Sequence, residues 1–197
     1  MEAERLNQML KLQHELNTII DKDWRERDRP WYRAAYIELV EAIEHHNSWK
    51  WWKSHDPDFE QAFMEVIDTI HFAMSQRDTP FDAPIENYGE DSLGFVKTCE
   101  FVIKDLVNDR QIYDYIMLDL FELAHILGYT EEDIYRTYVA KNLLNIFRQQ
   151  NGYKDGSYIK DWNGEEDNVI LARIMATTDD VEKIREDLQE FYKGVKK

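Results

Sequence analysis

Two short acidic motifs carry the residue types best suited to metal-assisted chemistry. Glu38 and Glu41 lie three positions apart, and so do Glu65 and Asp68. On a helix this spacing places both carboxylates of a pair on one face. Four carboxylates brought together repel one another unless a cation lies among them, and oxygen-only ligands suit magnesium or manganese rather than zinc. The motifs therefore predict a site for Mg²⁺, with Mn²⁺ as a possible substitute.

The alternative is that these carboxylates lie on the solvated faces of ordinary amphipathic helices. In the helix of the first pair, an apolar stripe with Leu39, Val40 and Ile43 lies opposite the acids, so periodicity alone predicts a wet acidic face. In the helix of the second pair, His71 and Phe72 lie beside the acidic face, and apolar residues surround nearly the whole helix. Such a helix is usually buried, and buried carboxylates need partners. The second pair therefore favours a site.

Aromatic and amide residues near the acidic motifs could recognise a nucleobase. The segment 49–53, WKWWK, holds three of the six tryptophans and could be either a stacking platform or core. Gln13 and Asn17 are one helical turn apart, so two amides share a face and could read the edge of a base. His71 alone is as well explained by a structural role. No serine or cysteine nucleophile is indicated, so hydrolysis would have to be metal-assisted.

A cationic segment stands out in an acidic protein. The chain has a formal net charge of −16, yet residues 136–160 contain only one acid, Asp155. The segment could be a chance cluster on a helix and loop, or a docking place for a small anion. Its basic residues are Arg136, Lys141, Arg148, Lys154 and Lys160.

The pattern of apolar residues predicts an all-α fold of about seven helices, because apolar residues recur at three and four and strict alternation is absent. We expect one domain over residues 1–197, with a loop or small insert around 78–108. Thr130 and Asp133 resemble a capping box that starts a helix. The expected helices cover about 4–20, 31–46, 57–76, 95–107, 110–127 and 131–150, and two short helices follow within 169–195.

Composition excludes several classes of partner and predicts a location. The acidic balance argues against nucleic acid, whose binding depends on neutralising phosphates with Lys and Arg. No stretch offers the roughly 20 apolar residues of a membrane span. A single cysteine, Cys99, and the lack of a signal peptide in 1–17 predict a protein of the reducing cytoplasm.

Four sequence blocks in order resemble the dimeric all-α dUTPases, relatives of the MazG-like nucleotide pyrophosphohydrolases. They are LQHELN at 12–17, ELVE at 38–41 followed by WKWWK at 49–53, EVIDTIHF at 65–72, and YVAKNLLNIFRQQNGYKDGSYIK at 138–160, continuing to Asn168. Each acidic pair alone is a weak signal, whereas the four blocks together are specific. The resemblance covers most of the chain.

The resemblance implies a role for each matching residue. Metal binding falls to Glu38, Glu41, Glu65 and Asp68. Phosphate binding falls to Lys141, Arg148, Tyr153, Lys154 and Lys160. Contacts to uracil and deoxyribose fall to Gln13, Asn17, Trp52, His71, Phe72 and Asn145, although Trp49 or Trp51 could replace Trp52.

The implied activity is magnesium-dependent hydrolysis of dUTP to dUMP and pyrophosphate, with dUDP as a further substrate, by a homodimer. Glu41 is the preferred base that orients the attacking water, and Glu38 is the next choice. One alternative is an enzyme of the same fold that prefers dCTP or accepts many nucleotides. Another is a helical partner-binding protein without activity, against which the four intact acids argue.

Overall fold

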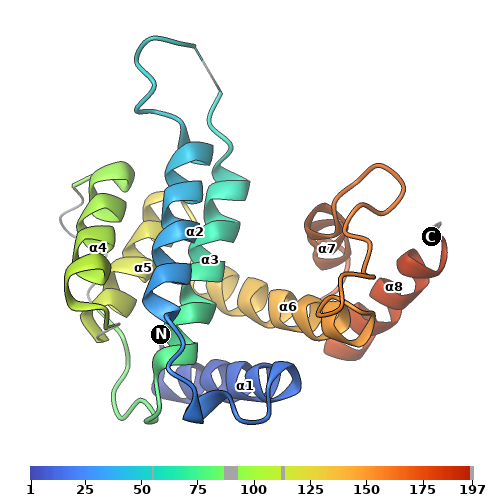
Figure 1. Ribbon diagram of the computed structural model, residues 1–197. Coiled ribbons are helices and arrows are strands. Elements are labelled where there is room, and N and C mark those ends of the chain that lie inside the picture. The colour runs from blue at the N-terminus through green and yellow to red at the C-terminus, as the bar shows by residue number, and fades with distance from the viewer. Residues whose placement is uncertain (55, 87–92, 112–113, 196–197) are drawn as a thin grey trace.

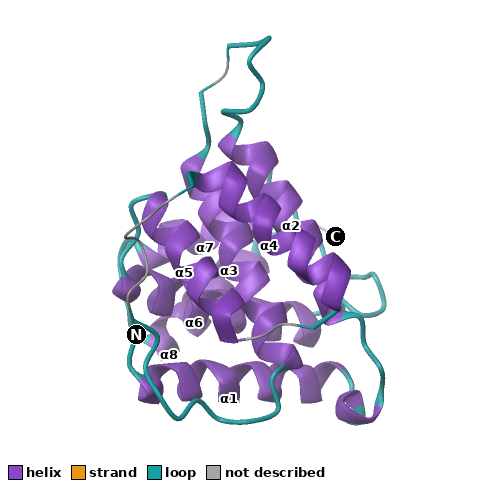
Figure 2. Cartoon of the chain, turned by 90° about the vertical axis from the view of Figure 1, so that its left-hand side faces the viewer, coloured by secondary structure: helices purple, strands orange, loops and turns teal. Residues whose placement is uncertain are grey.

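The computed structural model describes residues 1–54, 56–86, 93–111 and 114–195, which form an all-α bundle without strands (Figures 1 and 2). The expected fold class is therefore confirmed. None of the helices in these ranges combines the length and the apolar character that crossing a membrane requires. The helices are α1 (Ala3–Ile20), α2 (Trp31–His46), α3 (Phe59–Gln76), α4 (Phe95–Asp109), α5 (Asp114–Ile126), α6 (Glu131–Gln150), α7 (Asp167–Met175) and α8 (Val181–Lys193), with a 3₁₀ turn at Trp24–Glu26.

Local sequence signals set most helix ends. The capping box is confirmed, because the Thr130 hydroxyl accepts from the Asp133 N–H and the Asp133 carboxylate accepts from the Thr130 N–H. The helix expected from residue 57 begins at Phe59, since the Asp58 side chain caps the free N–H of Gln61. The helix expected from 110 begins at Asp114. Residues 87–92 of the predicted loop and 112–113 lie outside the described residues.

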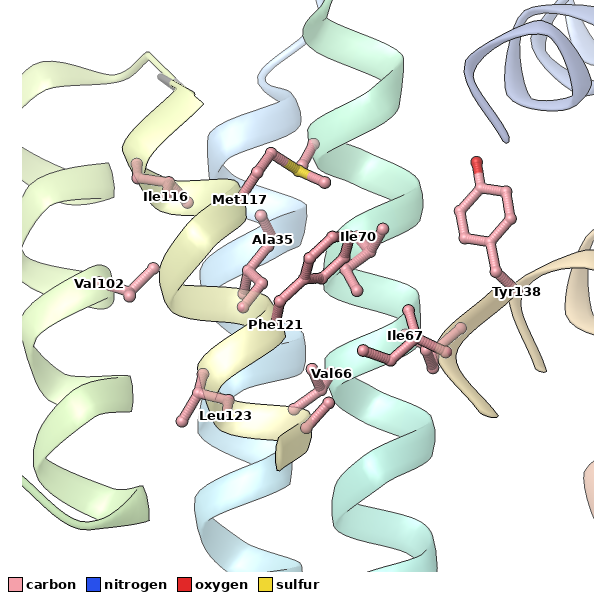
Figure 3. Packing of buried hydrophobic residues seen from close by; sticks show 14 of the residues in the cluster. Ala35, Val66, Ile67, Ile70, Val102, Ile116, Met117, Phe121, Leu123 and Tyr138 are labelled. Carbon is pink, nitrogen blue, oxygen red and sulfur yellow. The ribbon is translucent and has the colours of Figure 1, made fainter. Parts of the chain in front are cut away.

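The main core surrounds an antiparallel pair of helices, α2 and α3, which pack closely along their length (Figure 1). Helices α4 and α5 cover one side, and Phe121 of α5 and Ile70 of α3 belong to the same core (Figure 3). Leu39 is fully buried as its place in the apolar stripe predicts, whereas Val40 is 52% exposed. The assignment of Val40 to the core stripe is wrong, because the buried face of α2 is narrower than the run of apolar residues.

A second, smaller core lies at the far end of α6. Helix α6 extends out of the bundle, and α7 and α8 pack against its outer half (Figure 1). Tyr138 on α6 belongs to the main core. Leu144 and Phe147, further along α6, belong to the second core, together with Trp162 of the loop between α6 and α7 and Leu188 of α8. Helix α6 therefore needs apolar residues on several faces, because it is shared by two cores.

A buried ion pair ties the C-terminal helices to α6. The Asp167 carboxylate is completely buried and accepts from Arg148 Nε at 2.8 Å, from Arg148 Nη2 at 2.7 Å and from the Tyr158 hydroxyl at 2.7 Å. Burial alone would raise the pKa of Asp167, but the hydrogen bonds and charge of Arg148 outweigh it and hold that pKa below its ordinary value. The paired N–H donors of the Arg148 guanidinium thus bind a carboxylate of the protein itself.

We predict that Asp167→Ala destabilises the protein by about 3–5 kcal/mol, because it leaves the buried Arg148 cation without its partner. Urea denaturation followed by circular dichroism measures the change. Glu165→Ala is the control: it removes an exposed ion pair with Arg173 in the same region and should cost less than about 1 kcal/mol. Equal losses of unfolding free energy in the two variants would show that the buried ion pair stabilises the protein no more than the exposed one.

Candidate active site

One pocket of about 960 Å³ gathers side chains from α1, α2, α3, α6 and the segment that follows α6. The walls differ in chemistry: carboxylates come from α2 and α3, amides from α1, and cations from α6 and beyond. Of the residues predicted to form the site, only Lys141 and Trp52 do not line this pocket. Those that do are Gln13, Asn17, Glu38, Glu41, Glu65, Asp68, His71, Phe72, Asn145, Arg148, Tyr153, Lys154 and Lys160.

The antiparallel packing of α2 and α3 brings the two acidic motifs together. Glu38 of α2 and Glu65 and Asp68 of α3 each offer a carboxylate oxygen, and these oxygens lie within 4.8 Å of one another. Glu41, one turn further along α2, lines the pocket as an exposed side chain outside this cluster. The close packing of the two helices therefore produces a three-carboxylate cluster with a fourth acid beside it.

Burial and mutual repulsion disfavour the charged forms of the carboxylates in the cluster. Burial, the charge of Asp68 and a hydrogen bond with Glu65 raise the pKa of Glu38 to about 8. Burial and the charge of Asp68 also raise the pKa of Glu65. A divalent cation bound by these oxygens would remove the repulsion, and an oxygen-only donor set suits Mg²⁺ or Mn²⁺. The residues present therefore fit such an ion.

Lys141 lies behind the acidic cluster rather than at the pocket surface. Its side chain is 1% exposed, and its ammonium group donates to Asp68 Oδ2 at 2.7 Å and to Asn168 Oδ1 at 3.2 Å. This contact fixes the Asp68 carboxylate and supplies a positive charge to the cluster. The structure thus places this predicted phosphate-binding lysine against a predicted metal ligand.

The cationic segment forms the opposite rim of the pocket. Lys154 and Lys160 are exposed there, and the Lys154 ammonium donates to the carbonyl of Ile20 at the end of α1 at 2.6 Å. Arg148 contributes differently, because its Nε and Nη2 groups hold Asp167 and its Nη1 group donates to Asn145 Oδ1 at 2.9 Å. The exposed positive charge of this rim comes from the two lysines.

The end of the pocket nearest α1 is polar, uncharged and deeply buried. Gln13, Asn17 and His71 are 4%, 3% and 4% exposed, yet Asn17 Nδ2 and His71 Nε2 have no hydrogen-bond partner. Burial is the main cause that lowers the pKa of His71 to about 3, so its imidazole is neutral. Phe72 stacks on Trp31 at 6.3 Å beside these groups. Two unpaired polar atoms next to an aromatic wall suit the edge and face of a planar base.

The structure does not bring Trp52 to the pocket of its own chain. Trp52 is 57% exposed and stacks edge-on with Trp49 and Trp51 in the loop between α2 and α3, which extends well beyond the bundle (Figure 1). The tryptophans that do line the pocket are Trp24 and Trp31. Trp24 lies within the charged stretch after α1 and Trp31 directly follows it, and only the fold places both at the pocket.

Sequence reasoning assigned no role to several residues near the cluster. His45 Nε2 is 3.9 Å from Glu65 Oε1. The position of His45 one turn after Glu41 on the same helix could have indicated that it lies near the acidic cluster. Glu166 and Asn168 line the pocket and lie within the last matched block, so that block was the available signal. The buried role of Asp167 had no signal in the periodicity of the chain.

Taken together, a carboxylate cluster, a lysine rim and a neutral base-sized end suit hydrolysis of a nucleotide phosphoanhydride. A comparison with curated proteins gave no significant match. The sequence model of the dUTPase family matches residues 5–153, which is more than half of the chain and includes the acidic motifs of α2 and α3. The chain therefore belongs to the dUTPase family and is a hydrolase that acts on dUTP.

Proposed function

We propose that this dUTPase works with Mg²⁺ held by Glu38, Glu65 and Asp68, with Glu41 completing the set. The single observation that carries the proposal is the convergence of three carboxylates within 4.8 Å at the wall of the nucleotide-sized pocket. When bound, the ion supplies positive charge that polarises the α-phosphate and stabilises the transition state. Mn²⁺ has similar ligand preferences and is the expected substitute.

In this proposal Glu41 orients and deprotonates the attacking water. It is an exposed acid that lines the pocket beside the cluster, so it can reach a water molecule in front of the α-phosphate. The water oxygen forms a bond to the α-phosphorus while the bond to the bridging oxygen of the β-phosphate breaks. The products are dUMP and pyrophosphate, or dUMP and phosphate from dUDP. Glu38 is the alternative base, although its place in the cluster suits it better to the metal.

The β- and γ-phosphates are proposed to lie along the lysine rim. Lys154, Lys160 and the Tyr153 hydroxyl present donors there, and Asn145 is held beside them by Arg148. Arg148 has already given its paired donors to Asp167, so we assign it one remaining Nη1 donor and a share of positive charge. Lys141 is assigned to the orientation of Asp68, which its ammonium contacts directly.

The metal assignment predicts that Asp68→Asn and Glu65→Gln each lower kcat by more than about a hundredfold. Loss of groups that only orient metal ligands already costs about 10- to 100-fold, and these variants remove the ligands themselves. The second measurement is stabilisation of the protein by Mg²⁺ in a thermal melt without substrate, which both variants should lose.

Asp119→Asn is the matched control. Asp119 on α5 is a half-buried carboxylate whose pKa is raised to about 6 by burial and by Glu122 and Asp105, but it does not line the pocket. Its variant should keep both activity and the response to Mg²⁺. Near wild-type activity in the Asp68 and Glu65 variants would move the catalytic site elsewhere.

We further propose that the buried end of the pocket reads uracil. Asn17 Nδ2 is an unpaired donor that suits O4 of the base, and neutral His71 can offer Nε2 as an acceptor for the N3–H group. Cytosine presents an amino donor and a bare N3 at these positions, so both contacts would pair like with like. The stacked Trp31 and Phe72 rings lie near enough to cover part of the nucleoside.

This assignment predicts at least a tenfold preference for dUTP over dCTP in kcat/KM, since unpaired buried groups cost about 1–3 kcal/mol each. The Asn17→Ala variant should lose most of it. Both nucleotides compete in one reaction, and chromatography separates the products. Equal consumption by the wild type would support the broad-specificity alternative. A preference that survives in Asn17→Ala would place the reading of the base elsewhere.

A homodimer is the proposed assembly, supported by exposed apolar residues on α2 and in the loop that follows it. Ile37 and Val40 are three positions apart on α2 and are 44% and 52% exposed. The loop after α2 adds Trp51 at 88% and Trp52 at 57% exposure. Exposed apolar residues grouped in this way are typical of a contact between protein chains.

The Val40→Glu variant is predicted to sediment as a monomer, whereas the wild type sediments as a dimer, because a charge in an apolar contact is left without water or partner. Val181→Glu on α8 is the control and should stay dimeric. A monomeric wild type, or a dimer untouched by Val40→Glu, would contradict the proposed surface.

A cytoplasmic location is also proposed. Cys99 is buried among the side chains of the main core, where burial raises the pKa of its thiol and leaves it unreactive. A thiol of this kind is compatible with a reducing compartment.

A further inference from the structure

The side-chain amide of Gln13 is completely engaged inside the protein. Its Nε2 group donates to Asn17 Oδ1 at 3.0 Å and to Ser75 Oγ at 2.9 Å, and its Oε1 atom lies 2.7 Å from His71 Nδ1. All four residues are buried, with exposures of 4% or less. Both ends of the Gln13 amide are therefore hydrogen-bonded to neighbouring side chains, and Gln13 links these side chains to one another.

Ser75 decides which way the Gln13 amide points. The Ser75 hydroxyl has a single proton, which it donates to the carbonyl of His71 one turn earlier on α3 at 2.9 Å. Its oxygen can then only accept, so it must face the NH₂ end of Gln13. The Tyr138 hydroxyl donates to the carbonyl of Met9 at 3.1 Å and lies 3.4 Å from Gln13 Oε1 (Figure 3 shows its ring). The amide oxygen is consequently directed at His71.

The orientation of Gln13 determines the proton position on His71. Facing the amide oxygen, Nδ1 must carry the hydrogen, and in a neutral ring Nε2 is then a bare acceptor. On its other side, Gln13 donates to Asn17 Oδ1, which leaves Asn17 Nδ2 as the outward donor. These outward atoms, His71 Nε2 and Asn17 Nδ2, are the two that lack partners.

We propose that Ser75 is a specificity-determining positioning residue that acts through the amide of Gln13 to fix the His71 tautomer. With the amide held as it is, the pocket offers one acceptor and one donor, the complement of the uracil edge. With the amide reversed, His71 would present Nε2–H and Asn17 would present its oxygen, which is the complement of the cytosine edge. The choice between bases thus rests on a residue that need not touch them, given the base contacts proposed above.

The test measures the tautomer directly in the ligand-free protein. Long-range ¹⁵N–¹H NMR of the histidine rings, with His71 assigned from a His71→Phe variant, separates a protonated from a bare ring nitrogen. The wild type should show His71 with Nδ1 protonated and Nε2 bare. In Ser75→Ala the nitrogen shifts should move toward an average of the two tautomers, because either orientation of Gln13 is then allowed.

Specificity is measured on the same proteins. The dUTP over dCTP ratio in kcat/KM should fall about tenfold in Ser75→Ala, mainly through faster use of dCTP, since a reversed amide becomes accessible. Ser75→Thr keeps the hydroxyl and should restore both the tautomer and the ratio. Thr98→Val is the control, because it removes a buried hydroxyl on α4 that donates to the carbonyl of Gly94, the residue before α4, away from the pocket. It should change neither measurement.

The possible outcomes separate this proposal from the assignment of the base contacts. An unchanged His71 tautomer in Ser75→Ala would overturn the role of Ser75, whatever the base preference. An altered tautomer with an unchanged dUTP over dCTP ratio would also overturn it as a determinant of specificity. If the wild type shows the expected tautomer yet uses both nucleotides equally, the contacts of Asn17 and His71 with uracil are wrong instead. The proposal is supported if Ser75→Ala loses both the single His71 tautomer and the preference for dUTP over dCTP, and if Ser75→Thr restores both.

Discussion

The burial of like charges between α2 and α3 is the constraint on which the rest of this structure depends. The carboxylates of Glu38, Glu65 and Asp68 lie close together and are half-buried, so their negative charges repel one another. A helix pair built only for stability would place leucines there. The surrounding structure compensates for part of this repulsion, because the ammonium group of Lys141 on α6 donates to Asp68. The remaining repulsion provides the binding energy for a cation.

That compensation links the acidic cluster to the C-terminal helices through a continuous polar path. Lys141 donates to Asn168, whose amide oxygen also accepts from Arg148, and Arg148 is clamped by Asp167. The path runs along α6, the helix shared by the two cores, and ends in the buried hydroxyl contact of Tyr158. Because most of these groups are buried, each fixes the next. The segment beyond the family match is therefore part of the same pocket and not an appendage to it.

The end of the pocket nearest α1 recognises its ligand through neutral hydrogen bonds, whereas the end with the acidic cluster and the lysine rim acts through charge. A phosphate is recognised by charge, and exposed lysines with mobile side chains serve that purpose. The edge of uracil differs from that of cytosine in its pattern of donors and acceptors, so its recognition needs protein donors and acceptors of fixed orientation. The buried network of Gln13, Ser75 and His71 meets this requirement, since every amide and hydroxyl orientation in it depends on another.

The sequence by itself determined the helices and the chemistry carried on their faces. Periodicity and capping predicted α2 and α6 to within a residue, and the spacing within the pairs Glu38/Glu41 and Glu65/Asp68 predicted that each pair shares one helix face, because both are local properties of a helix. Only the tertiary structure decided what Arg148 holds, that Lys141 lies behind Asp68, and that Trp31 and not Trp52 borders the pocket of its own chain. These contacts join residues far apart in the chain. The buried partner of a charge is chosen by packing, which no local pattern encodes.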